Sequence, residues 1–140
     1  MKKKSRYIII IFIIGFSYIQ AHISIWGFNI PKNELSDVII TTKENSYMIT
    51  DSNLVLELTK EVSKMKKLNK IVANNYPLSK DNSTKFIKIL VQTKNKGTYG
   101  GSFWNNDNSI VFDSNGYYWS TSKNLFDLMD KSLQHAKKLY

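Results

Sequence analysis

The positions of apolar and polar residues along the chain predict an apolar N-terminal helix followed by one mixed domain. Residues Tyr7 to Ile19 (YIIIIFIIGFSYI) carry no charge and directly follow the basic stretch KKKSR at residues 2–6. Water cannot solvate such a run as a surface helix, so we expect a membrane to receive it. Because the basic residues precede the run, the positive-inside rule places the N-terminus in the cytoplasm and the remaining chain outside it.

The length of the apolar run leaves two fates open. Read strictly, the run has about 13 residues, the size of a signal-peptide core, and cleavage near Ala21 would release a secreted protein. Read from Tyr7 to Trp26, it has about 20 residues, enough to cross the roughly 30 Å of bilayer hydrocarbon with Trp26 at the outer interface. We favour this second interpretation, in which residues 1–27 form a signal anchor and residues 7–26 contact the membrane.

Residues 28–37 (FNIPKNELSD) contain Pro31 and have no apolar period, so they are predicted to be a linker. One extracytoplasmic domain is predicted over residues 38–140. Its first part, Val38 to Ile49, alternates loosely between apolar and polar residues and indicates a strand or a small hairpin.

Two amphipathic helices are predicted within the domain. Residue types that favour helix N-caps occupy positions 50–53 and again 120–122, each time just before apolar residues at helical spacing. The first apolar series comprises Leu54, Leu58, Val62, Met65 and Leu68, and the second comprises Phe126, Met129, Leu133 and Ala136. Lys137 and Lys138 are expected at the end of the second helix, where cations complement its dipole.

Strands are predicted between the two helices. Residues 86–93 (FIKILVQT) alternate most clearly, with Ile87, Ile89 and Val91 expected on one face. An antiparallel meander should follow, with strands over 98–104, 109–112 and 117–120. The fold class is therefore α+β, one small domain with a mostly antiparallel sheet and two helices on one face.

Two glycine positions refine this meander. Gly100-Gly101 inside a strand indicates a bulge or a close approach by another group. Asn115-Gly116 predicts a hairpin turn, because such turns require positive φ angles.

Composition limits the partners that the chain can have. Four of its nine net positive charges lie in residues 2–6, which leaves +5 for the domain, and Arg6 is the only arginine. Lysine lacks the planar fork that suits base and phosphate recognition, so we expect no nucleic-acid partner. The positive field could instead attract anionic lipid head groups or wall polymers, or simply support solubility.

Candidate contact residues are aromatic. Tyr99, Phe103, Trp104 and Tyr118 lie in the meander and could form an exposed strip that stacks on sugars or grips a peptide. Aromatic residues also stabilise each other across strands, and this second explanation is favoured.

The sequence offers little for catalysis. Asp81, Asp107 and Asp113 occupy predicted loops, but their spacing matches no metal-binding loop and such residues are common in turns. The chain has no Cys and two His, His22 and His135, so neither a zinc site nor a Cys-His pair can be assembled. No cofactor is expected.

The pattern resembles small extracytoplasmic domains of Gram-positive bacteria of the YhfM-like kind. The resemblance rests on DVIITT, the helix after ITDSN, KKLNKIVANNYP, FIKILVQT and YYWSTSKNLFDLM. Such domains often belong to lipoproteins, whose lipid-modified cysteine is missing here. The resemblance implies no catalytic residue.

We therefore expect a non-enzymatic binding module at the outer membrane surface, with a protein or cell-wall partner bound through aromatic strands or an open sheet edge. An immunity protein against a toxin or secreted enzyme is the alternative. A small hydrolase that uses the loop carboxylates is the third possibility.

Overall fold

A computed structural model describes residues 2–68, 85–104, 110–113, 115–122 and 124–140. The helices are α1 (Lys2–Ala21), α2 (Ser52–Ser63) and α3 (Leu125–Leu133), with a short 3-10 helix η1 (Lys32–Glu34). The strands are β1 (His22–Ile25), β2 (Phe28–Pro31), β3 (Leu35–Thr42), β4 (Ser46–Ile49), β5 (Lys66–Lys67), β6 (Phe86–Thr93), β7 (Thr98–Trp104), β8 (Ile110–Asp113), β9 (Tyr118–Ser120) and β10 (Lys137–Lys138).

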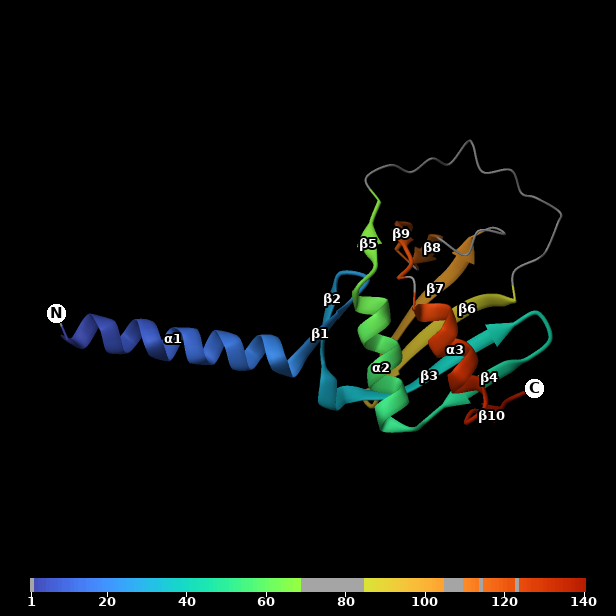
Figure 1. Cartoon of the computed structure of the whole chain (residues 1–140), viewed down its shortest axis with the longest axis horizontal. Helices are drawn as coiled ribbons and strands as arrows, with labels where there is room; N and C mark the ends of the chain where they lie inside the picture. The colour runs from blue at the N-terminus through green and yellow to red at the C-terminus, as the bar shows by residue number, and fades with distance from the viewer. Residues whose placement is uncertain (1, 69–84, 105–109, 114, 123) are drawn as a thin grey trace.

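The protein is α+β, as the sequence predicts. Eight strands form one sheet in the order β10-β4-β3-β6-β7-β8-β9-β5, and neighbouring strands pair antiparallel. Helices α2 and α3 lie side by side on one face of this sheet, while α1 extends away from the rest of the molecule (Figure 1). We call residues 22–140 the body.

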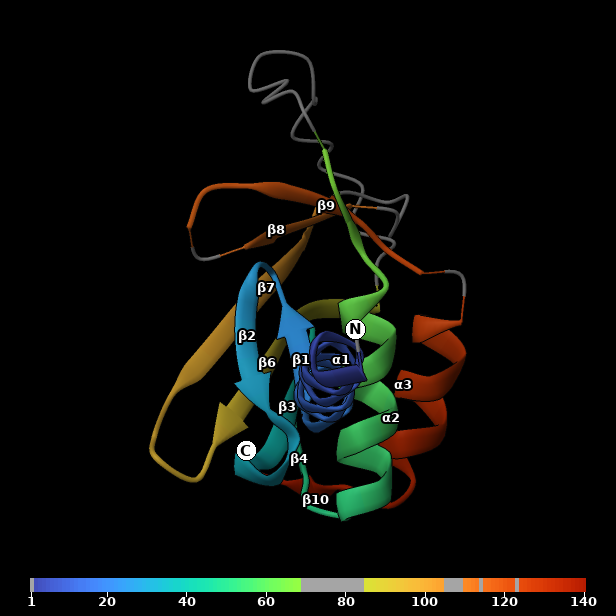
Figure 2. The ribbon, with the colours of Figure 1, turned by 90° about the vertical axis from the view of Figure 1, so that its left-hand side faces the viewer.

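A second, two-stranded sheet lies at the start of the body, where the sequence predicts a linker. Strands β1 and β2 form a hairpin beside α2 (Figure 2). Its apolar residues Ile23, Ile25, Trp26 and Ile30 are all buried in the core. The predicted linker over residues 28–37 is therefore wrong, and the folded body starts at His22 because core residues begin at position 23.

The turn of this hairpin is tight and has an unusual residue in it. Trp26 has φ of 47° and Gly27 has φ of 85°, so both central residues adopt left-handed conformations. A two-residue turn with two positive φ angles matches the twist of the flanking strands. Trp26 tolerates the strain because its indole ring is buried, which also removes it from the membrane interface where the sequence placed it.

Helix α2 begins as predicted and ends earlier. The side chain of Asp51 accepts hydrogen bonds of 3.0 Å from the backbone N–H groups of Asn53 and Leu54, which caps the helix. The helix ends at Ser63, and from Lys66 the chain is extended because β5 pairs with β9 and supplies one edge of the sheet.

A bulge changes which residues of β6 reach the core. The register between β3 and β6 shifts between Thr41 and Thr42, so that Phe86 opposes Thr42 while Ile87 has no partner. Consequently Phe86 is buried and Ile87 is 43% exposed, whereas the sequence pattern placed Ile87 on the same face as Ile89 and Val91. Ile89 and Val91 are buried, as predicted.

The final helix is shorter than the sequence predicts. Helix α3 ends at Leu133, and Lys137 and Lys138 form β10 instead of a helix end. The reason lies in the free edge of β4: Leu139 N–H donates to the carbonyl of Ser46 at 2.8 Å. The C-terminal residues thus satisfy backbone groups that a longer helix would leave unpaired.

The structure can be compared with the predictions made for Gly100 and Gly116 in the meander. A Cβ atom on Gly100 would lie 2.8 Å from Cδ2 of Leu90, which confirms the predicted close approach by another group. Gly116 adopts the positive φ, 88°, that the predicted turn requires.

Replacing Ile25 by alanine tests whether the hairpin belongs to the core. Ile25 is fully buried, so the substitution should lower the free energy of unfolding by about 2–5 kcal/mol. Urea unfolding of the detergent-solubilised chain, followed by tryptophan fluorescence, measures this change. Ile87→Ala makes the same chemical deletion at an exposed position and should cost much less; equal costs would contradict the packing of the hairpin.

Candidate functional site

The aromatic residues predicted to contact a partner are packed inside the fold where their side chains are described. The Tyr99 ring is partly buried and lies 5.1 Å from the ring of Phe28 in β2. Phe103 lies 5.4 Å from Phe126 of α3, in a cluster that also includes Phe86.

Of the other two predicted contact residues, only Tyr118 has a described side chain. Tyr118 is buried, at 9% exposure, and the side chain of Trp104 lies outside the described residues. Tyr99, Phe103 and Tyr118 therefore pack within the fold, which agrees with the favoured interpretation that these aromatics stabilise the sheet.

The predicted loop carboxylates provide no described site. Asp81 and Asp107 lie outside the described residues, and Asp113 ends β8 with its side chain outside them. Over the parts of the chain that the structure describes, no three His, Asp or Glu residues are arranged to hold a metal ion.

The two outer strands of the large sheet are unsuited to accept another strand. Both have two residues, and all four residues are lysines: Lys66–Lys67 in β5 and Lys137–Lys138 in β10. Short, charged outer strands discourage edge-to-edge pairing. This arrangement weakens the hypothesis that a partner binds at an open sheet edge.

Helix α1 has an unusual surface, because its large apolar side chains are exposed. We call its apolar part, Tyr7 to Ala21, the stem. Eleven large apolar side chains between Tyr7 and Ile19 are 51–75% exposed, and they lie on all sides of the helix. Within the described residues, no helix has both the length and the hydropathy that a membrane crossing needs.

The stem joins the body without a linker. Ala21 is the last residue of α1, and His22 is the first residue of β1. The His22 ring stacks on the Tyr18 ring with centroids 3.9 Å apart, and its Nδ1 lies 2.8 Å from the Tyr18 carbonyl oxygen. Asn29 Nδ2 donates to the Tyr18 hydroxyl at 3.0 Å. These contacts attach the end of the stem to the hairpin.

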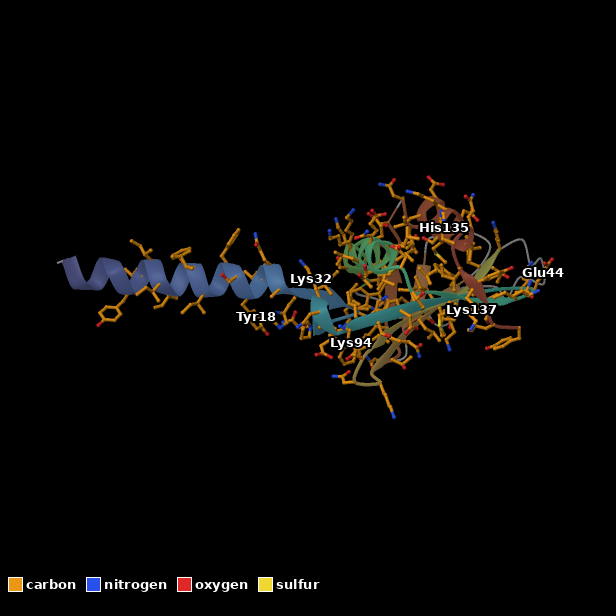
Figure 3. All side chains as sticks on the ribbon, turned by 90° about the horizontal axis from the view of Figure 1, so that it is seen from below. Tyr18, Lys32, Glu44, Lys94, His135 and Lys137 are labelled. Carbon is orange, nitrogen blue, oxygen red and sulfur yellow. The ribbon has the colours of Figure 1, made fainter. Side chains whose placement is uncertain are left out.

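Two lysines gather where the stem leaves the body. Lys32 Nζ donates to the Gln20 carbonyl at 2.5 Å, and Lys94 Nζ donates to the Asn33 carbonyl at 2.6 Å. Tyr18, Lys32 and Lys94 accordingly lie together at this end of the body, far from Glu44 and Lys137 (Figure 3). We call this end, formed by Asn29, Lys32, Asn33 and Lys94, the base.

Sequence reasoning did not find the base. In the sequence, β3, β4, α2, β5 and β6 lie between Lys32 and Lys94, and no motif connects the two residues. Their proximity depends on the β6–β7 turn reaching η1, where the Lys94 N–H also donates to the Glu34 carbonyl at 2.8 Å.

A groove of about 410 Å³ lies between α2 and α3. Its lining residues are Glu57, Lys60, Glu61, Ser63, Lys64, Asn124 and Leu128. Glu61 is the least exposed charged group there, with 12% of its side chain exposed, and it pairs with Lys64 through one carboxylate oxygen. The other oxygen accepts a hydrogen bond of 2.7 Å from the Ser122 hydroxyl. Glu61 thus connects α2 to the segment before α3.

The surroundings of Glu61 lower its pKa. Burial acts to raise the pKa, but the hydrogen bonds from Lys64 and Ser122 and the charge of Lys64 outweigh it, so the pKa lies below its ordinary value of 4.5. Both oxygens are held by partners, which fits a structural carboxylate better than a catalytic acid.

Comparison of the chain with protein-family models, with curated proteins and with solved structures finds no match. The candidate site therefore rests on the geometry of the stem and the base.

Glu61→Gln should reduce stability in a pH-dependent way. Because the pKa of Glu61 is lowered by folding, its carboxylate stabilises the fold at neutral pH, and this contribution is lost as the pH falls below about 4.5. The difference in unfolding free energy between wild type and Glu61→Gln should therefore be largest near pH 7 and shrink towards pH 3. Glu57→Gln, in the same groove but exposed, is the control; an equal pH dependence in both variants would contradict the role of Glu61.

Proposed function

We propose that this protein is a membrane-anchored binding module, with the stem in the bilayer and the body outside the cytoplasm. The observation that carries the proposal is the all-round exposure of the apolar side chains of the stem. Transfer of such side chains from water into hydrocarbon is favourable by about 1.5–3 kcal/mol for each fully buried Ile or Phe. A lipid bilayer provides this environment on every side of a single helix.

The flanks of the stem support its orientation. Lys2, Lys3, Lys4 and Arg6 precede it, and basic residues stay on the cytoplasmic side. At the other end, Lys32 Nζ donates to the Gln20 carbonyl in the last turn of α1, where positive charge complements the helix dipole. The body then stands on the outer side of the membrane.

The junction supports retention of the stem over its cleavage. Proteolysis favours exposed, flexible segments, whereas Ala21 is helical and His22 pairs with Pro31 in β1–β2. The stem is short for an anchor: about 15 residues span roughly 22 Å, against roughly 30 Å of hydrocarbon. Local thinning of the bilayer and snorkelling of Arg6 and Lys4 would compensate for the difference.

The body is the part of the protein available to a partner. Its described aromatic residues are largely packed and its outer strands are blunted by lysine, so the remaining candidate surfaces are the polar α2–α3 groove and the end of the body opposite the base. We propose a non-enzymatic role because no three described His, Asp or Glu residues are arranged to hold a metal ion, and the carboxylate beside the Ser122 hydroxyl, that of Glu61, is already paired with Lys64.

Charge in the middle of the stem should release the protein from membranes. Ile11→Asp with Ile14→Asp places two carboxylates at the centre of the span, each costing about 2.5–3.5 kcal/mol of insertion free energy. Carbonate-washed membranes from expressing cells should contain the wild-type chain and lose the variant. Ile11→Leu with Ile14→Leu keeps the stem apolar and should remain; equal retention of both variants would contradict the anchor.

Single cysteines should report the orientation, since the natural chain has none. In intact cells, a membrane-impermeant maleimide should label Lys43→Cys, whereas Ser5→Cys should react only after the membrane is opened. Mass spectrometry of the labelled Lys43→Cys protein should find the full-length chain. The reverse labelling pattern would overturn the orientation, and a chain starting at His22 would overturn retention.

A further inference from the structure

We infer that the base of the body binds phosphate groups of anionic lipids through Lys32 and Lys94, so that the body rests on the membrane surface. This inference rests on the proposed anchor and adds the surface of the body that meets the bilayer and the chemistry of its partner. Its starting point is geometric: the stem enters the body with no intervening residues.

The short stem brings the base to the membrane surface. With roughly 22 Å of apolar helix in a hydrocarbon layer of roughly 30 Å, and basic residues fixed on the cytoplasmic side, the body is drawn towards the bilayer. Head groups occupy roughly the next 5–7 Å beyond the hydrocarbon. The residues around the exit of the stem therefore lie among lipid head groups.

Lys32 and Lys94 are suited to that environment. Each ammonium group has three N–H donors, and one donor of each is used in the bond to Gln20 or Asn33. These two bonds hold both lysines at the end of the body where the stem exits (Figure 3). Glu34, two residues after Lys32 in the chain, has a partly buried side chain. The two lysines therefore present positive charge at the exit of the stem, and lipid phosphate is the anion that a membrane surface offers there.

The fold places these lysines without relying on flexible segments. The β6–β7 turn is held by hydrogen bonds from the Thr93 N–H to the Gly97 carbonyl at 2.9 Å and from the Thr93 hydroxyl to Asn95 Oδ1 at 2.5 Å. Gly97 is required there, since a Cβ atom would lie 2.7 Å from Thr93 Oγ1. The turn consequently presents Lys94 in a defined position beside η1.

The test uses the full chain in vesicles of neutral phosphatidylcholine, with or without anionic phosphatidylglycerol. A fluorophore on Asn33→Cys reports the base, and one on Glu44→Cys reports the opposite end of the body. Anionic lipid should protect the Asn33 probe from iodide quenching and leave the Glu44 probe unchanged. Lys32→Gln with Lys94→Gln should abolish this protection, because each lysine favours the bound state by about 5-fold, or about 25-fold together.

Control variants separate the possible outcomes. Lys43→Gln with Lys137→Gln removes the same charge at the opposite end and should keep the protection, as should Lys32→Arg with Lys94→Arg. Equal quenching in neutral and anionic vesicles, or protection that survives Lys32→Gln with Lys94→Gln, would overturn the inference while the anchor stands. Protection by soluble polyphosphate in neutral vesicles would overturn the assignment to lipid. Failure of the chain to float with vesicles would overturn both the anchor and the inference.

Discussion

Four apolar side chains of the β1–β2 hairpin, Ile23, Ile25, Trp26 and Ile30, complete the core beside α2. At about 1.5–3 kcal/mol each, their burial outweighs the roughly 1–3 kcal/mol that the left-handed conformation of Trp26 costs. This packing fixes the first residue of the body and leaves no linker. The position of the stem, the contacts at the base and the proposed approach to the membrane all depend on it.

The outer strands of the large sheet are also formed by short segments that directly follow other elements. One face is covered by α2 and α3, and the hairpin lies beside α2. The outer strands come from segments that the sequence pattern assigned to helices: β5 follows α2 within three residues, and β10 follows α3. Each segment satisfies backbone groups at an edge of the sheet, and its lysines keep other strands away. The same four lysines therefore form the outer strands of the sheet and discourage pairing with strands of other molecules.

Periodicity predicted the elements that have a single buried face. Helices α2 and α3 and strand β6 were recognisable because their apolar residues repeat at one spacing, and Asp51 supplied a clear helix start. The hairpin was missed because His22-Ile23-Ser24-Ile25 alternates within a longer apolar context that favours a membrane helix. The bulge at Ile87 left no local signal, since it arises from pairing with β3. The base could not be predicted either, because Lys32 and Lys94 come to the same end of the body only through tertiary structure.

A helix that passes directly into a paired strand transmits rotation as well as position. Each residue of an α-helix advances the chain by 1.5 Å and turns it by about 100°. One residue added to or removed from the stem would therefore turn the whole body by about a quarter of a revolution about the axis of α1. If the stem anchors the protein as proposed, the number of its residues, and not only their hydrophobicity, sets the direction in which the α2–α3 groove faces within the membrane plane.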